Sequence, residues 1–266
     1  MKKNLFIAGA VLFLGIFAVV AWVLRPPAEA TAPIEAIPLA TATTASVPEE
    51  SVVEPTQAET SETETDSYPV PEQAVVQAEN AYPAPEDTGT VLFTLVQAES
   101  EARFTLSEEL RGVPTTVIGS TDQVAGEIAV DLSNPANTQL GTIQVNARTV
   151  ETNNDFRNRA IQNEILQTGS FEFITFTPTS LSGLPASIAV GDTVSFQITG
   201  DLTIREITQT VTFEVTATLV TADRLEGLAS VLVTRTAFSL AIPSVPNVAN
   251  VSDEVLVELE FVAVPK

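Results

Sequence analysis

The sequence predicts an all-β domain that follows an N-terminal membrane segment and a linker, and three observations indicate this organisation. Residues 1–25 contain an uncharged run of 20 residues, residues 26–89 are rich in proline and acid, and residues 90–266 alternate between apolar and polar side chains. Alternation with a period of two is typical of strands with one buried and one solvated face. Only residues 153–167 depart from it, with helical spacing. Many amphipathic strands with one helix favour a closed barrel or a sandwich.

The uncharged run, residues 5–24, is predicted to be a single-pass membrane anchor. At about 1.5 Å per residue, a helix of this length spans the roughly 30 Å hydrocarbon core. Lys2 and Lys3 precede it, which favours a cytoplasmic N-terminus. The competing interpretation is a signal peptide cleaved after Ala28-Glu29-Ala30. Both interpretations place residues 90–266 outside the cytoplasmic membrane, in the periplasm or on the cell surface.

Residues 26–89 are predicted to be a disordered acidic linker. They hold 10 of the 17 prolines and 13 acidic residues, and they contain no lysine or arginine. Such a composition cannot bury enough apolar surface to offset the entropy of ordering. A flexible chain of this length has a root-mean-square span of roughly 40–48 Å. We therefore expect a spacer that carries the domain away from the bilayer, or a linker whose sequence hardly matters.

Residues 90–266 carry the strand pattern. The clearest run lies between Thr210 and Leu219, where apolar residues alternate with threonine and glutamate. Two further runs with this alternation lie at 193–199 and 254–261. Weaker strands are predicted at 90–98, 100–106, 115–120, 123–131, 141–149, 171–182 and 224–235.

The single helix is predicted at 153–167. Apolar residues recur there at helical spacing from Phe156 to Leu166. Thr152 or Asn153 can cap its beginning, and Gly169 is a plausible end.

Composition excludes several classes of function. The net charge is −22, whereas binding the polyanionic backbone of a nucleic acid requires clustered cations. The chain has no cysteine and no histidine. Disulfides, thiolate or imidazole metal sites, cysteine nucleophiles and Ser-His-Asp triads are therefore excluded. We expect no catalytic residue, no metal site and no enzymatic activity.

The charged side chains of the domain are expected to be structural. Neighbouring acids such as Glu108 and Glu109 point to opposite faces of a strand, so they cannot converge and are expected on the solvated surface. The arginines near the helix and after the 193–199 run are expected in ion pairs, or one or two of them on the polar head of a ligand. These are Arg148, Arg157, Arg159 and Arg205.

Three segments resemble the YceI-like family of proteins. Thr149–Arg159 is similar to the family's entry into its helix, and Phe171–Phe176 to the strand that follows. The segment Gly200–Val211, GDLTIREITQTV, resembles the family's signature. The order and spacing of these segments match over residues 90–266. Two departures are Glu206, where the family usually has glycine, and the absence of a histidine from the early strands.

The resemblance implies a lipocalin-like antiparallel barrel of about eight strands with a helix beside it. It also implies a ligand rather than a cofactor, namely a long apolar chain such as a polyisoprenoid or an isoprenoid quinone inside the barrel. The alternatives are a structural or adhesion domain with a filled barrel, or a lipid-modifying enzyme that acts through carboxylates. Inward-facing residues either contact the ligand or pack a dry core. The candidates are Ile174, Phe176, Val194, Phe196, Ile198, Val211, Phe213, Val215 and Leu219.

Overall fold

The computed structural model describes residues 26–31, 33–39 and 89–266. The predicted membrane anchor at 5–24, together with residues 32 and 40–88 of the predicted linker, lies outside these residues. In the part of the chain that is described, no helix is long and apolar enough to cross a membrane. The domain is all-β with one short helix, as the alternation of the sequence predicts.

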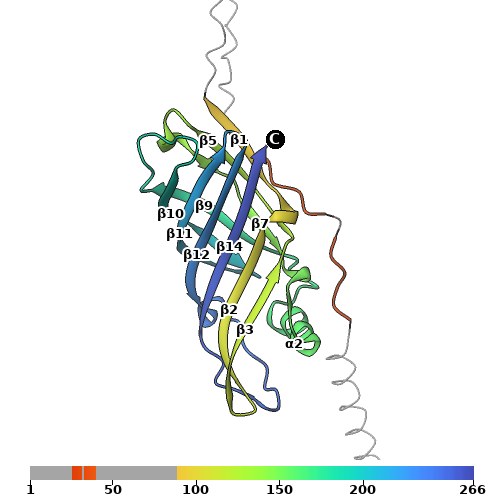
Figure 1. Ribbon diagram of the computed structural model, residues 1–266. Helices are drawn as coiled ribbons and strands as arrows, with labels where there is room; N and C mark the ends of the chain where they lie inside the picture. Colours follow the sequence, from red (N-terminus) through yellow and green to blue (C-terminus); the bar gives the residue numbers. More distant parts are fainter. Residues whose placement is uncertain (1–25, 32, 40–88) are drawn as a thin grey trace, which may run out of the picture. The chain divides into compact units, whose positions relative to one another are not determined.

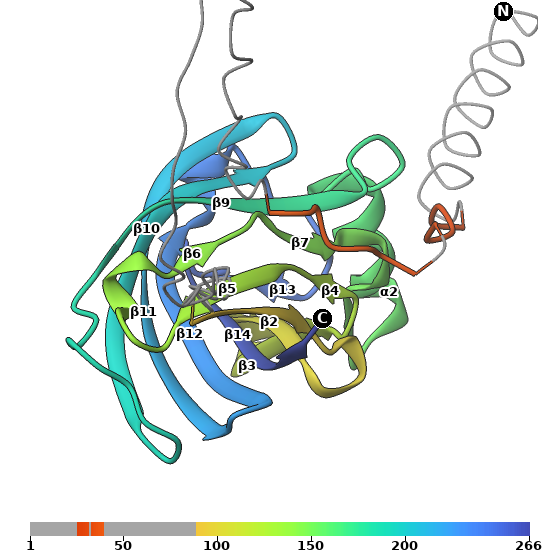
Figure 2. The same ribbon diagram turned by 90° about the horizontal axis from the view of Figure 1, so that it is seen from above.

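One antiparallel sheet of fourteen strands curls into a barrel (Figures 1 and 2). Four of the fourteen strands form a branch off the main strand order. The wall of the barrel follows the order β4-β7-β9-β10-β11-β12-β14-β1-β5-β6, while β2 pairs with β14, β3 and β13, and β8 pairs with β3. The strands are β1 (Thr90–Leu95), β2 (Glu101–Leu110), β3 (Val113–Thr121), β4 (Val124–Ala125), β5 (Glu127–Asp131), β6 (Gln139–Leu140), β7 (Ile143–Asn146), β8 (Glu151–Thr152), β9 (Phe173–Ser182), β10 (Thr193–Ile204), β11 (Ile207–Thr221), β12 (Arg224–Thr234), β13 (Val248–Ala249) and β14 (Glu254–Pro265).

The barrel closes where β4 and β5 meet. Only Gly126 separates these two strands; β4 pairs with β7, and β5 pairs with β1. The amide of Leu95 donates to the carbonyl oxygen of Gly126 at 3.1 Å, which bridges the interruption. Because β4 and β6 are only two residues long, the barrel wall is weakest at this seam.

The β10–β11 hairpin shows how alternation builds the wall. Its outward face carries a ladder of hydroxyl pairs, such as Thr199 with Thr212 at 2.9 Å and Thr193 with Thr218 at 2.8 Å between oxygen atoms. Its inward face is apolar, and Phe213 is buried there. Threonine suits this position because its branched Cβ packs well on a pleated surface while its hydroxyl remains paired.

Two glycines let aromatic rings cross neighbouring strands. A Cβ atom at Gly200 would lie within 3 Å of the ring of Phe176, and one at Gly227 within 3 Å of the ring of Phe261. Any larger residue would therefore have to displace a phenylalanine of the interior.

The helical segment is shorter and less regular than predicted. Helix α2 spans Asp155–Ala160, and a π-helical turn continues it over Ile161–Ile165. The cap is Asn154, one residue later than the sequence indicated, because its side chain accepts from the amides of Phe156 and Arg157 at 3.0 Å. The prediction of one helix near 153–167 is confirmed within these narrower bounds.

Residues 29–31 and 33–39, which we call the strap, lie against the barrel without forming a helix or strand. The carbonyl oxygen of Glu29 accepts from Arg148 Nη1 at 3.0 Å, and the amide of Thr31 donates to Glu172 Oε1 at 2.8 Å. Ile34 is buried. The prediction of a disordered linker over 26–89 did not anticipate these contacts.

Candidate functional site: an apolar cavity in the barrel

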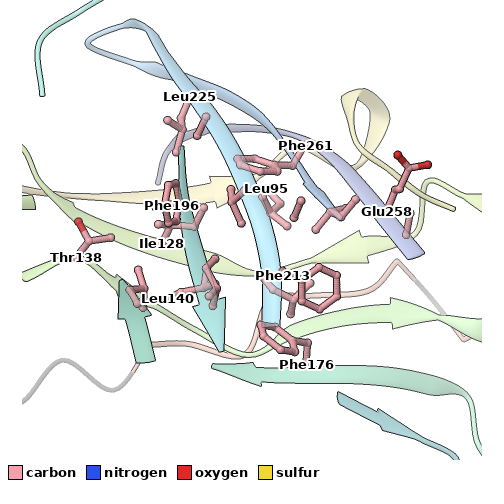
Figure 3. Close-up of a pocket in the computed structure, with 18 of the residues that line it drawn as sticks. Leu95, Ile128, Thr138, Leu140, Phe176, Phe196, Phe213, Leu225, Glu258 and Phe261 are labelled. Atoms are coloured by element: carbon pink, nitrogen blue, oxygen red, sulfur yellow. The ribbon is translucent and has the colours of Figure 1, made fainter. Parts of the chain in front are cut away.

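The interior of the barrel contains a cavity with apolar walls (Figure 3). Its volume is about 160 Å³. Phe176 and Phe213 meet edge to face in its wall, with ring centroids 4.9 Å apart. Leu184 and Ile188, from the loop that joins β9 to β10, line it at the end of the barrel away from α2.

Seven of the nine residues predicted to face a ligand line this cavity. They come from three adjacent strands, β9, β10 and β11, whose inward faces meet. Val211 and Leu219 do not line it: Val211 is half-buried against the core, and Leu219 is buried within it. The seven lining residues are Ile174, Phe176, Val194, Phe196, Ile198, Phe213 and Val215.

Sequence reasoning missed the lining residues from outside these three strands and three residues within them, Leu181, Leu202 and Ala217. Val257, Leu259 and Phe261 of β14 alternate with glutamate, so the pattern that located the others could also have located them. Leu184 and Ile188 lie in an irregular loop, where no period distinguishes an inward residue from an outward one. The other lining residues that the prediction omitted are Leu95, Ala102, Ile128, Val130, Thr138, Leu140, Ile143, Val145, Leu225, Ala229 and Glu258.

Polar groups are scarce in the cavity wall. Of the lining residues, only Thr138 and Glu258 carry polar side chains. The carboxylate of Glu258 is engaged by Arg103 Nε at 3.0 Å, and Figure 3 shows it directed away from Phe176 and Phe213. Thr138 Oγ1 is one of three buried side-chain polar atoms without a hydrogen-bond partner among the described residues. The wall therefore contains one unpaired hydroxyl, whose oxygen is itself buried, and no free charge.

The size and chemistry of the cavity together favour an apolar occupant. The volume of about 160 Å³ is far above the roughly 10–15 Å³ that a cavity needs to hold one water molecule. A buried water molecule needs two to four polar partners, and this wall provides almost none. Each methylene of an apolar chain buried here would contribute about 0.8 kcal/mol of favourable transfer free energy, and it would need no polar partner.

The arginines near the helix serve the fold rather than the cavity. Arg148 pairs with Glu172 at 2.8 Å, and Arg157 pairs with Glu108 at 2.6 Å. Glu108 is buried, so its prediction as a solvated surface acid was wrong: the strand directs it toward Arg157 of the helical segment.

The other two arginines also make structural contacts. Arg205 pairs with Glu206 at 3.1 Å, and its Nη1 donates to the carbonyl oxygen of Ile165 at 3.3 Å. It thereby holds the tip of the β10–β11 hairpin on the last turn of the helical segment. Its guanidinium holds the pKa of Glu206 below the ordinary value. Arg159 lies over the ring of Phe156, 5.8 Å from its centroid.

A curled antiparallel sheet around an apolar cavity defines the class of lipocalin-like barrels, which hold one small ligand inside. The profile of the YceI-like domain matches residues 93–263. The chain therefore belongs to the YceI-like domain family, as the three quoted segments predict.

Two solved structures show the same fold at low sequence identity. A polyisoprenoid-binding domain from Saccharophagus degradans, implicated in plant cell wall breakdown, is 15% identical with a TM-score of 0.52, over 66% of this chain and 99% of its own. BcnA of Burkholderia cenocepacia is 19% identical with a TM-score of 0.50, over 63% of this chain and 98% of its own. A YceI protein of Campylobacter jejuni is 16% identical over 56% of this chain and 84% of its own, with a TM-score of 0.45. Among curated protein sequences, none matches the chain.

Proposed function

We propose that this protein binds a long apolar lipid chain, such as a polyisoprenoid or an isoprenoid quinone, inside its barrel without chemically changing it. The proposal depends on one observation, the cavity whose wall carries a single unpaired hydroxyl. Membership of the YceI-like family supports it, as does the description of one protein of this fold as a polyisoprenoid-binding domain.

We further infer that residues 5–24 anchor the chain in the cytoplasmic membrane, with the barrel on the outer side. The uncharged run and the two preceding lysines support this. The full-length protein should then remain in the membrane fraction after a high-salt wash, with the barrel accessible to external protease. A chain recovered with Thr31 as its first residue would instead indicate a cleaved signal peptide.

The test of ligand binding compares two substitutions on β11 that differ only in the face they occupy. Val215 lines the cavity and is 3% exposed, whereas Thr216 lies on the outer face beside Ser195. Val215→Phe should fill part of the cavity and abolish the bound lipid that native mass spectrometry detects on the purified protein. Thr216→Phe should retain it.

Both variants must first be shown to unfold cooperatively, because overpacking a core costs about 1–3 kcal/mol. Equal lipid content in the two folded variants, or no lipid on the parent protein after incubation with polyprenol and with quinone, would contradict the proposal. The filled-barrel alternative would then be the better account.

A further inference from the structure

The strap limits how far the barrel can lie from the predicted membrane anchor. The anchor ends at Leu24, and the first barrel contact is made by Glu29, five residues later. An extended chain covers at most about 3.6 Å per residue, so these five steps span no more than about 18 Å. The 64-residue linker expected from composition would have allowed a separation of roughly 40–48 Å.

The first contacts of the strap lie at one end of the barrel. Glu29 and Thr31 bind Arg148 and Glu172, which precede β9. The helical segment lies at this same end, because Gln162 Nε2 donates to the carbonyl oxygen of Arg148 at 3.0 Å. Figure 1 shows α2 beside the barrel, toward the end at which β2 turns into β3. The turn between β11 and β12 lies at the opposite end, beyond the roughly 30 Å length of β9.

Helix α2 presents a solvent-exposed aromatic side chain near the first contacts of the strap. Phe156 is 74% exposed, the highest exposure of any large apolar side chain in the described part of the chain. The guanidinium of Arg159 lies over its ring. An apolar ring beside a cation on a long stem suits the boundary between acyl chains and head groups, where the stem can extend toward the phosphates.

We propose that the α2 end of the barrel rests on the bilayer surface and that Phe156 enters the interface. This inference rests on the proposed membrane anchor, and it commits to the lipid bilayer as the occupant of this face. Asp155, which directly precedes the phenylalanine, is exposed, as is Glu151, so we expect the contact to be apolar rather than electrostatic. It should form on zwitterionic lipid and should change little with salt, unlike a contact made through charges.

The test uses the full-length chain in phosphatidylcholine vesicles that contain a nitroxide-labelled lipid. The chain has no cysteine, so a fluorophore can be placed at one introduced thiol. Asp155→Cys lies next to Phe156, and Asp223→Cys, an identical change, lies in the β11–β12 turn at the far end. The label at position 155 should be quenched at least threefold more strongly than the label at 223. Equal quenching would overturn the proposal.

Two further substitutions separate the roles of the phenylalanine and the strap. Phe156→Ser should lower the quenching at position 155 at least twofold while the protein stays on the vesicles. Ile34→Ser, which removes the buried strap residue, should have the same effect, and Ile37→Ser, at a residue that is 44% exposed, should have none. Unchanged quenching in Phe156→Ser, or the same result for both strap variants, would contradict the proposal.

The outcome is independent of ligand binding. If the full-length chain does not sediment with the vesicles, the anchor is absent and the membrane contact is overturned. Native mass spectrometry of the same preparation reports separately whether the cavity holds lipid, so either proposal can fail while the other stands.

Discussion

Thr138 places an unpaired polar group in the otherwise apolar wall of the cavity. Its hydroxyl lies in the wall without a hydrogen-bond partner among the described residues, and leaving a buried hydroxyl unpaired costs about 1–3 kcal/mol. We expect the side chain to rotate when a ligand binds, so that the hydroxyl pairs with the polar end of the ligand. The residue therefore has a cost in the free protein that a ligand with a hydroxyl or carbonyl group could offset.

Thr138→Val should weaken binding of a polyprenol or quinone about two- to tenfold, the value of one neutral hydrogen bond, and should leave binding of a pure hydrocarbon chain unchanged or stronger. Titration of the two kinds of lipid by intrinsic or competitive fluorescence measures this. Thr94→Val is the matched control, because Thr94 Oγ1 is also buried and unpaired but does not line the cavity. Equal losses for both lipids would show that Thr138 acts only through packing.

The pair of Arg157 and Glu108 joins the helical segment to β2. Glu108 is buried, and its side chain contacts Arg157 Nη2 at 2.6 Å. Arg157→Leu leaves a buried carboxylate unpaired, which typically costs about 3–5 kcal/mol. Denaturant unfolding should detect this loss, whereas Arg159→Leu, which removes a cation from the surface of Phe156, should cost less than about 1 kcal/mol. A similar loss of unfolding free energy in both variants would show that the Arg157–Glu108 ion pair does not account for the destabilisation.

At the scale of elements, the sequence predicts the strands well and the irregular pieces poorly. The wall strands follow the alternation because each has one apolar and one wet face, as in the register of Ser195 with Thr216. The π-helical turn after α2 could not be predicted, because its apolar residues have the same spacing as those of an ordinary helix. The strap was missed for another reason: isolated residues such as Ile34 have no period, and their burial depends on a surface that exists only after folding.

The strap also illustrates how carboxylates hold a segment that has no secondary structure. The amide of Leu39 donates to Glu127 Oε2 at 2.7 Å, and Lys266 Nζ contacts the other oxygen at 2.7 Å. These bonds, first that of Lys266 and then that of Leu39, hold the pKa of Glu127 below the ordinary value of 4.5. At the other end of the strap, burial alone would raise the pKa of Glu172, but the hydrogen bonds from Thr31 and the charge of Arg148 lower it overall.

A carboxylate with a lowered pKa stabilises the docked strap fully above its ordinary pKa and loses this contribution as the pH falls through the lowered value. We therefore expect the strap to stay docked at neutral pH and to loosen only below about pH 4.5. The chemical shift of the Leu39 amide should titrate in this acidic range, and Glu127→Gln should abolish the titration. Glu35→Gln, at an exposed acid of the strap, should preserve it. A Leu39 amide that titrates near neutrality, or that is unaffected by Glu127→Gln, would contradict this account of the strap.

At the scale of the whole molecule, the strap means that both residues flanking 40–88 are held on the barrel, rather than one on the barrel and one at the membrane anchor. Leu39 is bonded to Glu127 at the beginning of β5, and Gly89 is bonded to Leu132 just beyond its end. Five residue steps of strand separate these two points, or about 16 Å. The two described residues on either side of 40–88, Leu39 and Gly89, are thus held at neighbouring sites on the barrel. The prediction that this segment forms no core of its own rests on composition alone, and composition carries no information about where the ends of the segment are held.

This connection makes loop length a test of the docked strap. The composition of residues 40–88 predicts a flexible chain, and closing a flexible loop costs free energy that grows as about 1.5 RT times the logarithm of its length. Replacing these 49 residues by eight glycine and serine residues, whose root-mean-square span of about 14–17 Å matches the gap, should stabilise the protein by about 1.5 kcal/mol. For a domain of this size, the gain corresponds to about 3–6 °C in Tm.

The gain in Tm should exist only while the strap is docked, because an undocked strap leaves no loop to close. Introducing Ile34→Ser into both the parent and the shortened chain should therefore remove most of the difference between their melting temperatures, whereas Ile37→Ser should preserve it. Differential scanning calorimetry of the four variants and the two parents decides between the alternatives. A free tether predicts no effect of shortening in any background, since a chain attached at one end pays no closure entropy. A docked strap predicts a gain in Tm on shortening that is lost when the buried Ile34 is replaced and kept when the exposed Ile37 is replaced.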